Sequence, residues 1–440
     1  MLLGYIPTTK LTSISNKAAR RRALANLFHT CMQTTLAPIG PYGETEVDMM
    51  SGDGVWWRCH PILAIFVGDY PEQALVTCTY NGRCPKCTVS PGQLGEYQSF
   101  PLRIQSKVLD TYLLSDGDIC AFHLACREIG MKPIFHPFWK SLPLTDIFHS
   151  ITPDILHQLL QGMVKHLIAW LVGIFGAAAI DTRCRALPLN HKILPFSKGI
   201  TTLSRISGHE HKKMSIILLS LIVDLPIPGG ADSSRVVRAA RALIDFLFLA
   251  QYKSHTSETI SLLQDHLIQF HNNKTIFLDL GVWKGFNLSK LHSLSHYLSS
   301  IWLFGTADNY NTEQSEQLHI DLAKDAYHAT NHKEELRQMT KWLERREKVR
   351  HYMGFIDWRQ QRGQDWNLLP RINIGPPRAD VLTTKMAQFP SRGKVSFDAL
   401  VTDHGALGFQ DSLAEYIAQI NHPGASRNAH SLISLLMKIT

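Results

Sequence analysis

An apolar run in the N-terminal half of the chain ends in a single carboxylate. Residues 62–67 (Ile-Leu-Ala-Ile-Phe-Val) have the length and composition of a buried strand, and Gly68 and Asp69 follow directly. A strand that delivers an acid at its end can place a ligand for Mg²⁺, because hard cations bind oxygen atoms held on a rigid backbone. The other interpretation is that Asp69 caps the turn Asp-Tyr-Pro-Glu, and the run by itself favours this cap.

The hydrophobic pattern of the chain changes near residue 116. Upstream it predicts a helix from Lys17 to about Leu36 and strands at 55–57, 62–67 and 74–80. Downstream the pattern is helical over 146–180, 211–224, 233–253, 256–273, 287–304 and 312–350. We therefore predict a small β-containing segment followed by a large helical region, an α-rich fold and no doubly wound sheet.

Composition limits the classes of protein that the chain can belong to. With 45% hydrophobic and 19% charged residues among 440, it is typical of a globular protein. The longest apolar stretch, Leu167 to Ile180, is shorter than the roughly 20 residues that span a bilayer, so we predict a soluble protein with no membrane partner. The net charge of +8 is compatible with a polyanionic partner but is a weak signal over this length.

Cys84 and Cys87 form a CxxC motif. No secretory signal is visible at the N-terminus, so a reduced compartment is expected, and in that setting the motif indicates a metal or redox site more than a structural disulfide. A metal site is favoured, because no thioredoxin-like βαβ pattern surrounds the motif. Two thiolates supply half of a Zn²⁺ site. Because a second CxxC is absent from the sequence, the remaining ligands would be histidines, and the candidates are His136, His149 and His157.

Two further pairs combine histidine with helical spacing. Asp154 and His157, at i, i+3 after Pro153, suit a metal ligand with a supporting carboxylate, or equally a first-turn acid beside a surface histidine. His292 and His296, at i, i+4, have a chelating geometry but no HExxH glutamate, which argues against a metalloprotease. For this second pair the residues alone favour a packed or hydrogen-bonded arrangement.

The densest polar cluster follows residue 307. Glu313, Glu316 and His319 recur at three-residue steps on one helical face, between Asp308 and Asp321. Glutamates on a helix are usually solvated. In a chain that also has Asp69, this stripe could complete a two-metal site.

Basic residues gather in two segments. Arg337, Lys341, Arg345 and Lys348 fall on one side of a charged helix that could contact DNA phosphates, although a solvated helix with i, i+4 ion pairs is slightly favoured. The segment Lys17-Ala-Ala-Arg-Arg-Arg22 could serve in DNA contact or nuclear import, although a solvated helix end is the more favoured interpretation.

Five segments in this order resemble the Plavaka-type transposases of fungi, which are similar to the transposases of CACTA DNA transposons. The resemblance covers roughly residues 1–410. The segments are Asp69-Tyr-Pro-Glu-Gln73, Arg83-Cys-Pro-Lys-Cys87, Thr152-Pro-Asp-Ile-Leu-His-Gln-Leu-Leu-Gln-Gly162 with Lys165-His166, Lys290-Leu-His-Ser-Leu-Ser-His-Tyr297 and Phe304-Gly-Thr-Ala-Asp-Asn-Tyr-Asn-Thr-Glu-Gln-Ser-Glu316.

The resemblance implies an RNase H-like core that uses three acids and Mg²⁺ or Mn²⁺ to cut and join DNA at transposon ends. Asp69 matches the second acid, and Glu316 is the choice for the third, with Glu313 as the alternative. Cys84, Cys87 and His157 match a zinc-like element, and His136 is a further candidate ligand. The implied fold is an α/β remnant of that core with a large, mainly α-helical insertion.

The chain also departs from the family pattern. The family's first acid precedes the segment that matches residues 2–7, and Asp53 lies too close to Asp69 to replace it. We therefore expect a chain truncated at both ends, with DNA strand transfer as an ancestral activity that is lost here. The alternative is a zinc-stabilised module that binds DNA or protein without catalysis.

The expected organisation has four parts. Residues 1–110 form the partial core with the CxxC element, 111–305 the helical insertion, 306–361 the segment that returns the third acid, and 362–440 a linker and tail. By the same resemblance, we expect a nuclear location, DNA as a partner and possible self-association.

Overall fold

The computed structural model describes residues 3–6, 9–188, 190, 196–361, 402 and 413. The chain divides into two compact units, Met1–Gly354 and Phe355–Thr440. The predicted linker and tail at 362–440 lie outside the described residues except for positions 402 and 413. The description that follows therefore concerns residues up to Gln361.

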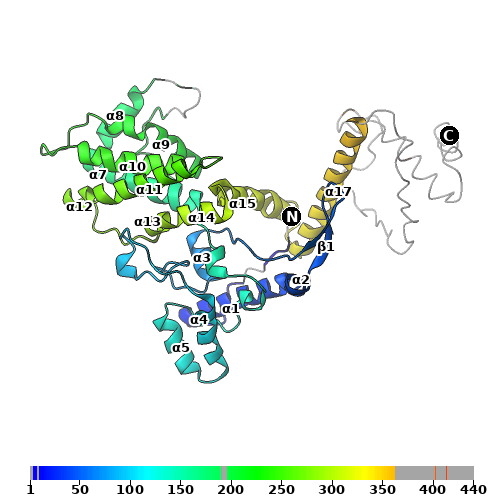
Figure 1. The fold of residues 1–440 in the computed structure, drawn as a ribbon. Helices are drawn as coiled ribbons and strands as arrows, with labels where there is room; N and C mark the ends of the chain where they lie inside the picture. Colours follow the sequence, from blue (N-terminus) through cyan, green and yellow to red (C-terminus); the bar gives the residue numbers. More distant parts are fainter. Residues whose placement is uncertain are drawn as a thin grey trace, which may run out of the picture. The chain divides into compact units, whose positions relative to one another are not determined.

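The N-terminal part is a set of short helices around a small core. Helix α1 (Lys17–Leu36) has the predicted bounds, and Asn16 caps its start, because the Asn16 side chain accepts hydrogen bonds from the backbone N–H groups of Ala18 and Ala19. Buried side chains of α1 pack with Tyr112, Phe122 and Trp139. The other helices of this part are α2 (Ile39–Thr45), α3 (Tyr70–Val76), η1 (Pro91–Gln93), α4 (Gln105–Leu113), η2 (Leu114–Asp116), α5 (Ile119–Glu128), η3 (Phe138–Ser141) and α6 (Ile147–Ser150) (Figure 1).

Strand structure is sparse in the described residues. Strands β1 (Val47–Met50) and β2 (Trp56–Cys59) pair antiparallel in a two-stranded ribbon, so the strand predicted at 55–57 is confirmed with shifted bounds. The run 62–67 contributes one parallel bridge, between Phe66 and Ile151. A complete RNase H-like sheet is not seen in the described residues, and the RNase H-like core stays a prediction.

The strand predicted at 74–80 is wrong, because its first residues belong to α3. The Asp69 carboxylate accepts a hydrogen bond from the backbone N–H of Glu72, and Pro71 lies in the first turn. Both features favour the start of a helix. This start signal therefore overrides the strand-like composition that follows it.

The helical region predicted downstream is confirmed. It consists of the π-helical segment η4 (Ile155–Val164) continued by α7 (Lys165–Phe175), then α8 (Ala177–Ala186), α9 (Gly208–Ile222), α10 (Ser234–Ala250), α11 (Ser257–Asn273), α12 (Ile276–Asp279), α13 (Ser289–Ser293), η5 (Leu294–His296), α14 (Tyr297–Phe304), η6 (Ala307–Tyr310), α15 (Thr312–His319), η7 (Ile320–Lys324), α16 (Asp325–His328) and α17 (Glu335–Gln361). Helices α7 to α12 gather into one body (Figure 1). A single apolar cluster runs through this body.

The continuous helix Ile155–Phe175 is long and apolar enough, by length and composition, to cross a membrane. Most of it is buried against the surrounding helices. Leu159, Met163 and Leu167 are fully buried, and Trp170 contacts the rings of Phe277 and Trp283. Burial of this kind is typical of the core helix of a soluble protein.

Candidate metal centre and acidic site

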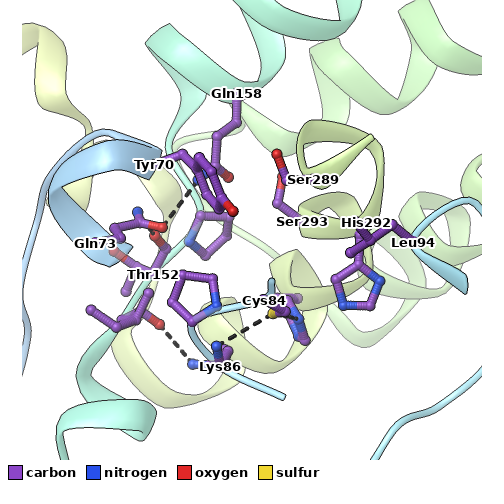
Figure 2. A pocket seen from close by; sticks show the side chains of 14 residues that line it. Tyr70, Gln73, Cys84, Lys86, Leu94, Thr152, Gln158, Ser289, His292 and Ser293 are labelled. Carbon is purple, nitrogen blue, oxygen red and sulfur yellow. Dashed lines mark hydrogen bonds between the residues drawn. The ribbon is translucent and has the colours of Figure 1, made fainter. Parts of the chain in front are cut away.

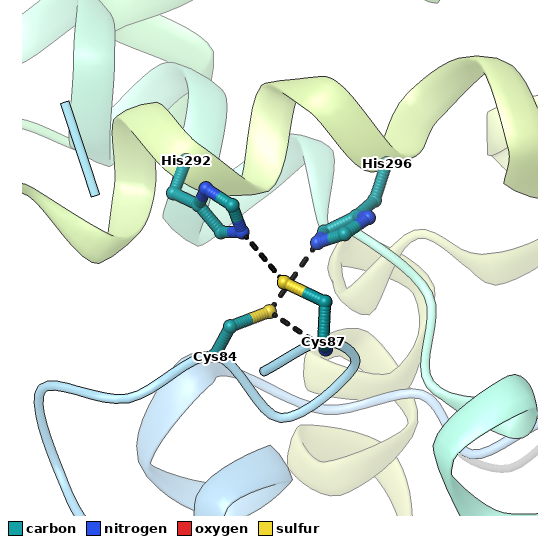
Figure 3. Close-up of side chains that lie close together, drawn as sticks. All are labelled: Cys84, Cys87, His292 and His296. Atoms are coloured by element: carbon teal, nitrogen blue, oxygen red, sulfur yellow. Dashed lines mark hydrogen bonds between the residues drawn. The ribbon is translucent and has the colours of Figure 1, made fainter. Parts of the chain in front are cut away.

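Two cysteines and two histidines meet between the CxxC loop and the helical region (Figure 3). The four ligand atoms of Cys84, Cys87, His292 and His296 all lie within 4.8 Å of one another. His292 Nε2 is 3.1 Å from Cys87 Sγ, and His296 Nε2 is 3.3 Å from Cys84 Sγ. Two sulfur and two nitrogen donors held this closely form the donor set of a structural Zn²⁺ site.

Local sequence explains how each half of this cluster is placed. The Pro85-Lys86 turn directs the backbone N–H groups of Lys86 and Cys87 at Cys84 Sγ, at 3.3 and 3.4 Å. His292 and His296 are one helical turn apart, so both rings point to the same side of α13 and η5. The cluster thus joins a loop to a helix far along the sequence.

The buried Lys86 side chain fixes the loop to the segment after α6. Its Nζ donates hydrogen bonds to the backbone oxygens of His149, at 3.1 Å, and Ile151, at 2.7 Å. Burial lowers the pKa of Lys86 to about 8. Ile151 also forms the bridge with Phe66, so the same residue holds both the CxxC loop, through Lys86, and the segment that leads to Asp69.

Electrostatics at the cluster favour one thiolate. Burial by itself would raise the pKa of the Cys84 thiol, but the hydrogen bond from the Cys87 thiol and the nearby His296 lower that pKa well below its ordinary value. The same hydrogen bond, together with burial, raises the pKa of Cys87. A negative sulfur beside two imidazoles suits a divalent cation, which would also draw off the second thiol proton.

The structure corrects the predicted set of ligands. Cys84 and Cys87 lie in the cluster, and the histidines beside them are His292 and His296, whereas the predicted His157 and His136 lie elsewhere. His136 is exposed, and the His157 ring is held at a different site by two carboxylates. The i, i+4 spacing of His292 and His296 was the signal that could have identified them, because a lone CxxC requires two more ligands.

A cavity of about 20 Å³ lies beside the cluster, lined among others by Tyr70, Gln73, Cys84 and His292 (Figure 2). Its volume is enough for about one water molecule. The Tyr70 hydroxyl donates to the Arg83 carbonyl at 2.9 Å and accepts from the Gly82 N–H at 2.7 Å, which ties α3 to the start of the CxxC loop.

Asp154 is a buried carboxylate at the junction of two helices. Its Oδ2 accepts hydrogen bonds from the backbone N–H of His157 at 2.6 Å and approaches His157 Nδ1 at 2.9 Å. Its Oδ1 accepts from the backbone N–H and the hydroxyl of Thr312, at 3.0 and 2.8 Å. Burial by itself would raise the pKa of Asp154, but these hydrogen bonds lower it.

His157 lies between Asp154 and the predicted third acid. Its Nε2 is 2.9 Å from Glu316 Oε1, while Nδ1 faces Asp154. The hydrogen bond with Asp154 raises the pKa of His157, with further contributions from the charges of Glu316 and Asp69. The charge of Asp69 thus acts on His157, while the Asp69 carboxylate caps α3, which is the role of the other interpretation; a catalytic role for Asp69 stays a prediction.

The parallel bridge explains why Asp69 and Asp154 end at the same edge. Phe66 pairs with Ile151, and each acid follows its bridge residue by three positions. Gln73 locks this arrangement, because its side-chain amide donates to the carbonyls of Gly68 and Thr152, both at 2.8 Å.

Glu313 and the basic helix lie apart from this contact. The Glu313 carboxylate accepts a hydrogen bond from Asn311 at 3.2 Å, whereas Glu316 meets His157. The predicted DNA-contacting side chains on α17 are all exposed, and Lys348 forms an i, i+4 ion pair with Glu344 at 2.6 Å. The exposed residues are Arg337, Lys341, Arg345 and Lys348.

The fold and these sites define a helix-rich protein with a Cys₂His₂ cluster and a neighbouring acidic site. Residues 1–171 match the family model of the Plavaka transposase, which confirms the predicted resemblance for this part of the chain. Among proteins with curated functions, none is similar enough to this chain to count as a match. The matched range contains Asp69, Cys84 and His157, whereas His292, His296 and Glu316 lie beyond it.

Proposed function

We propose that this protein is a transposase-derived DNA-binding protein whose fold is stabilised by Zn²⁺. DNA strand cleavage and transfer, with Mg²⁺ or Mn²⁺ at Asp69 and Glu316, is the ancestral activity. The observation that carries the proposal is the joining of two distant segments. The Cys₂His₂ cluster and the contact of Asp154 with Thr312 hold the family-matched part against residues 289–316.

The donor set supports a structural role for the metal. Four protein ligands leave no open coordination position, and structural Zn²⁺ sites in proteins are closed in this way. Because a ligated Zn²⁺ would cross-link the CxxC loop to α13 and η5, its binding energy would add to the stability of this junction.

The acidic site is better explained as an inherited feature than as a working site of DNA cleavage. Two-metal phosphoryl transfer needs several carboxylates around both ions. Both oxygens of Asp154 are taken by hydrogen bonds, and one oxygen of Glu316 contacts His157. In the described part of the chain, no three acids or histidines at this site bring their ligand atoms as close together as the Cys₂His₂ ligands. We therefore propose that this chain does not carry out strand transfer.

DNA binding is proposed from the positive charge of the chain and from its match to a transposase family. The chain has a net charge of +8, and Arg337, Lys341 and Arg345 on α17 have no ion pair among the described residues. Such side chains contact phosphates without regard to base sequence and release counterions on binding. A nuclear location and self-association of the chain accompany this proposal as expectations from the family.

A labelled DNA duplex bearing transposon-end repeats tests both parts. We expect binding that weakens steeply with salt, and no nicking in Mg²⁺ or Mn²⁺. Metal-dependent nicking that disappears in Asp69→Ala would overturn the proposed loss of cleavage. Asp265→Ala, an exposed acid on α11, is the matched control.

A second candidate is a zinc-stabilised module that binds protein and not DNA. The Cys₂His₂ cluster favours it equally, because a closed metal site stabilises a fold without specifying a partner. Bound Zn²⁺ together with no measurable binding of the DNA duplex, even at low salt, would favour this second function.

A further inference from the structure

A groove with a volume of about 1040 Å³ lies on the N-terminal part of the chain. Residues of α1, α3 and α5 and the segment 132–134 line it. None of the ligands of the metal centre and none of the acids at His157 is among its lining residues. The groove is therefore a separate surface that neither site explains.

The floor of the groove is apolar. Leu24, Ala25, Leu75 and Ile134 line it, and Ala25 and Ile134 are buried members of the underlying core. Leu124 also lines the groove, although its side chain is 60% exposed. An exposed leucine above a preformed apolar floor leaves hydrophobic surface that a partner can cover.

The rim of the groove is cationic and uncompensated. Arg21 and Arg22 of α1 and Arg127 of α5 are exposed, and none of them has an ion pair among the described residues. No aspartate or glutamate lines the groove. Lys132 lies on the same wall, where its Nζ donates to the Ala74 carbonyl at 3.2 Å.

We propose that this groove binds an acidic amphipathic segment of a partner protein. Apolar side chains of that segment cover Leu24 and Leu75 of the floor and the exposed Leu124 above it. Its carboxylates face the guanidinium groups of Arg21, Arg22 and Arg127. Helical peptides bind grooves in this manner, with apolar anchors one turn apart and charges at the rim. A DNA backbone would pair with the rim but has no apolar face for the floor, so a peptide fits both features and DNA only one.

The proposal is tested by selection from a display library of random peptides about 16 residues long, which is about four helical turns. Zinc-loaded full-length protein is the target. We expect enriched peptides to combine several acids with apolar residues at three- and four-residue steps. Arg21→Glu combined with Arg22→Glu is expected to weaken their binding by at least roughly tenfold, because each change replaces an attraction with a repulsion.

Leu124→Glu tests the apolar contact independently of the rim and is expected to weaken binding of the same peptides. Its side chain is exposed, so folding is preserved. Arg238→Glu on α10, an exposed arginine outside the groove, is the control and is expected to bind as the unmodified protein does. Affinity for a duplex DNA is expected to stay within about twofold in the Leu124 variant, because phosphates gain nothing from contact with an apolar side chain.

Three outcomes would overturn the proposal. They are a selection that enriches no acidic class, enriched peptides that bind the groove variants and the protein equally, and DNA affinity that falls with Leu124→Glu as much as peptide affinity does. The last outcome would assign the groove to DNA. Each result is independent of whether the Asp69 site cuts DNA.

Discussion

Asp154 Oδ1 accepts two hydrogen bonds from Thr312, one from its backbone N–H at 3.0 Å and one from its hydroxyl at 2.8 Å. The other carboxylate oxygen caps the helix that begins at Ile155. One buried acid therefore accepts hydrogen bonds from backbone N–H groups in the first turns of two helices, η4 and α15, that are far apart in sequence. Glu316 reaches His157 only because α15 starts at this point.

Replacing Asp154 is expected to destabilise the fold strongly. Asp154→Ala removes charge-assisted hydrogen bonds to groups that stay buried, and we expect a loss of about 3 kcal/mol in the free energy of unfolding measured with urea. Thr312→Ala should lose less, because its backbone N–H still bonds to Asp154. A double-mutant cycle with no coupling between the two residues would contradict the contact, and Asp265→Ala on the exposed face of α11 is the control.

The metal centre predicts which residues control Zn²⁺ content. The purified protein is expected to contain one Zn²⁺ per chain by elemental analysis, and Cys87→Ser or His296→Ala is expected to lose most of it. His136→Ala and His157→Ala should keep it, because neither ring lies in the cluster. Cys120→Ser, at an exposed thiol, is the matched control. Retention in His296→Ala together with loss in His157→Ala would restore the ligand set predicted from sequence.

Sequence patterns were sufficient for most of the helices and insufficient for the site. The bounds of α1 and the helices after residue 146 follow from apolar periodicity, which is local information. His292 and His296 also have a visible spacing, but only the tertiary fold brings them to Cys84 and Cys87. The prediction of a strand at 74–80 failed because it used only the β-branched composition of those residues. The signals that start the helix, Asp69 and Pro71, come before residue 74.

His157 also shows what the sequence can and cannot predict, because only one of its two carboxylate contacts is local. Its i, i+3 relation to Asp154 was visible, and the structure confirms that the two side chains meet. The contact with Glu316 depends on the position of α15, which Asp154 fixes through Thr312. The sequence could therefore nominate Glu316 only by resemblance, and could not separate it physically from Glu313.

Buried His29 predicts a loss of stability in mild acid. Its Nε2 lies 3.1 Å from the Leu75 carbonyl, and its Nδ1 accepts the Phe138 N–H at 3.4 Å, so the neutral ring is fully satisfied. Burial lowers the pKa of His29 from 6.5 to about 4, with a smaller effect from the nearby Lys132. Because the folded pKa is depressed, this stability is fully present above about pH 6.5 and is lost as the pH falls towards 4.

The expected loss is about 3 kcal/mol over that interval, from about 1.4 kcal/mol for each unit of pKa. Urea unfolding at several pH values measures it. His29→Gln should unfold more easily at pH 7 but show a flatter dependence on pH between 6.5 and 4. His123→Gln, at a half-buried histidine on α5, serves as the control and should retain the slope of the unmodified protein.

The exposed face of α17 predicts how DNA affinity depends on salt. If Arg337, Lys341 and Arg345 contact phosphates, replacing any one by Ala is expected to reduce the slope of log affinity against log salt by about 0.9, with no change in preference among DNA sequences. Lys348→Ala should change the slope less, because Lys348 already pairs with Glu344 at 2.6 Å and that ion pair competes with a phosphate. Fluorescence anisotropy over a salt series measures these slopes. Equal slopes for all four variants and for the unmodified protein would mean that α17 is a solvated helix, and that phosphate contacts must come from another face of the protein.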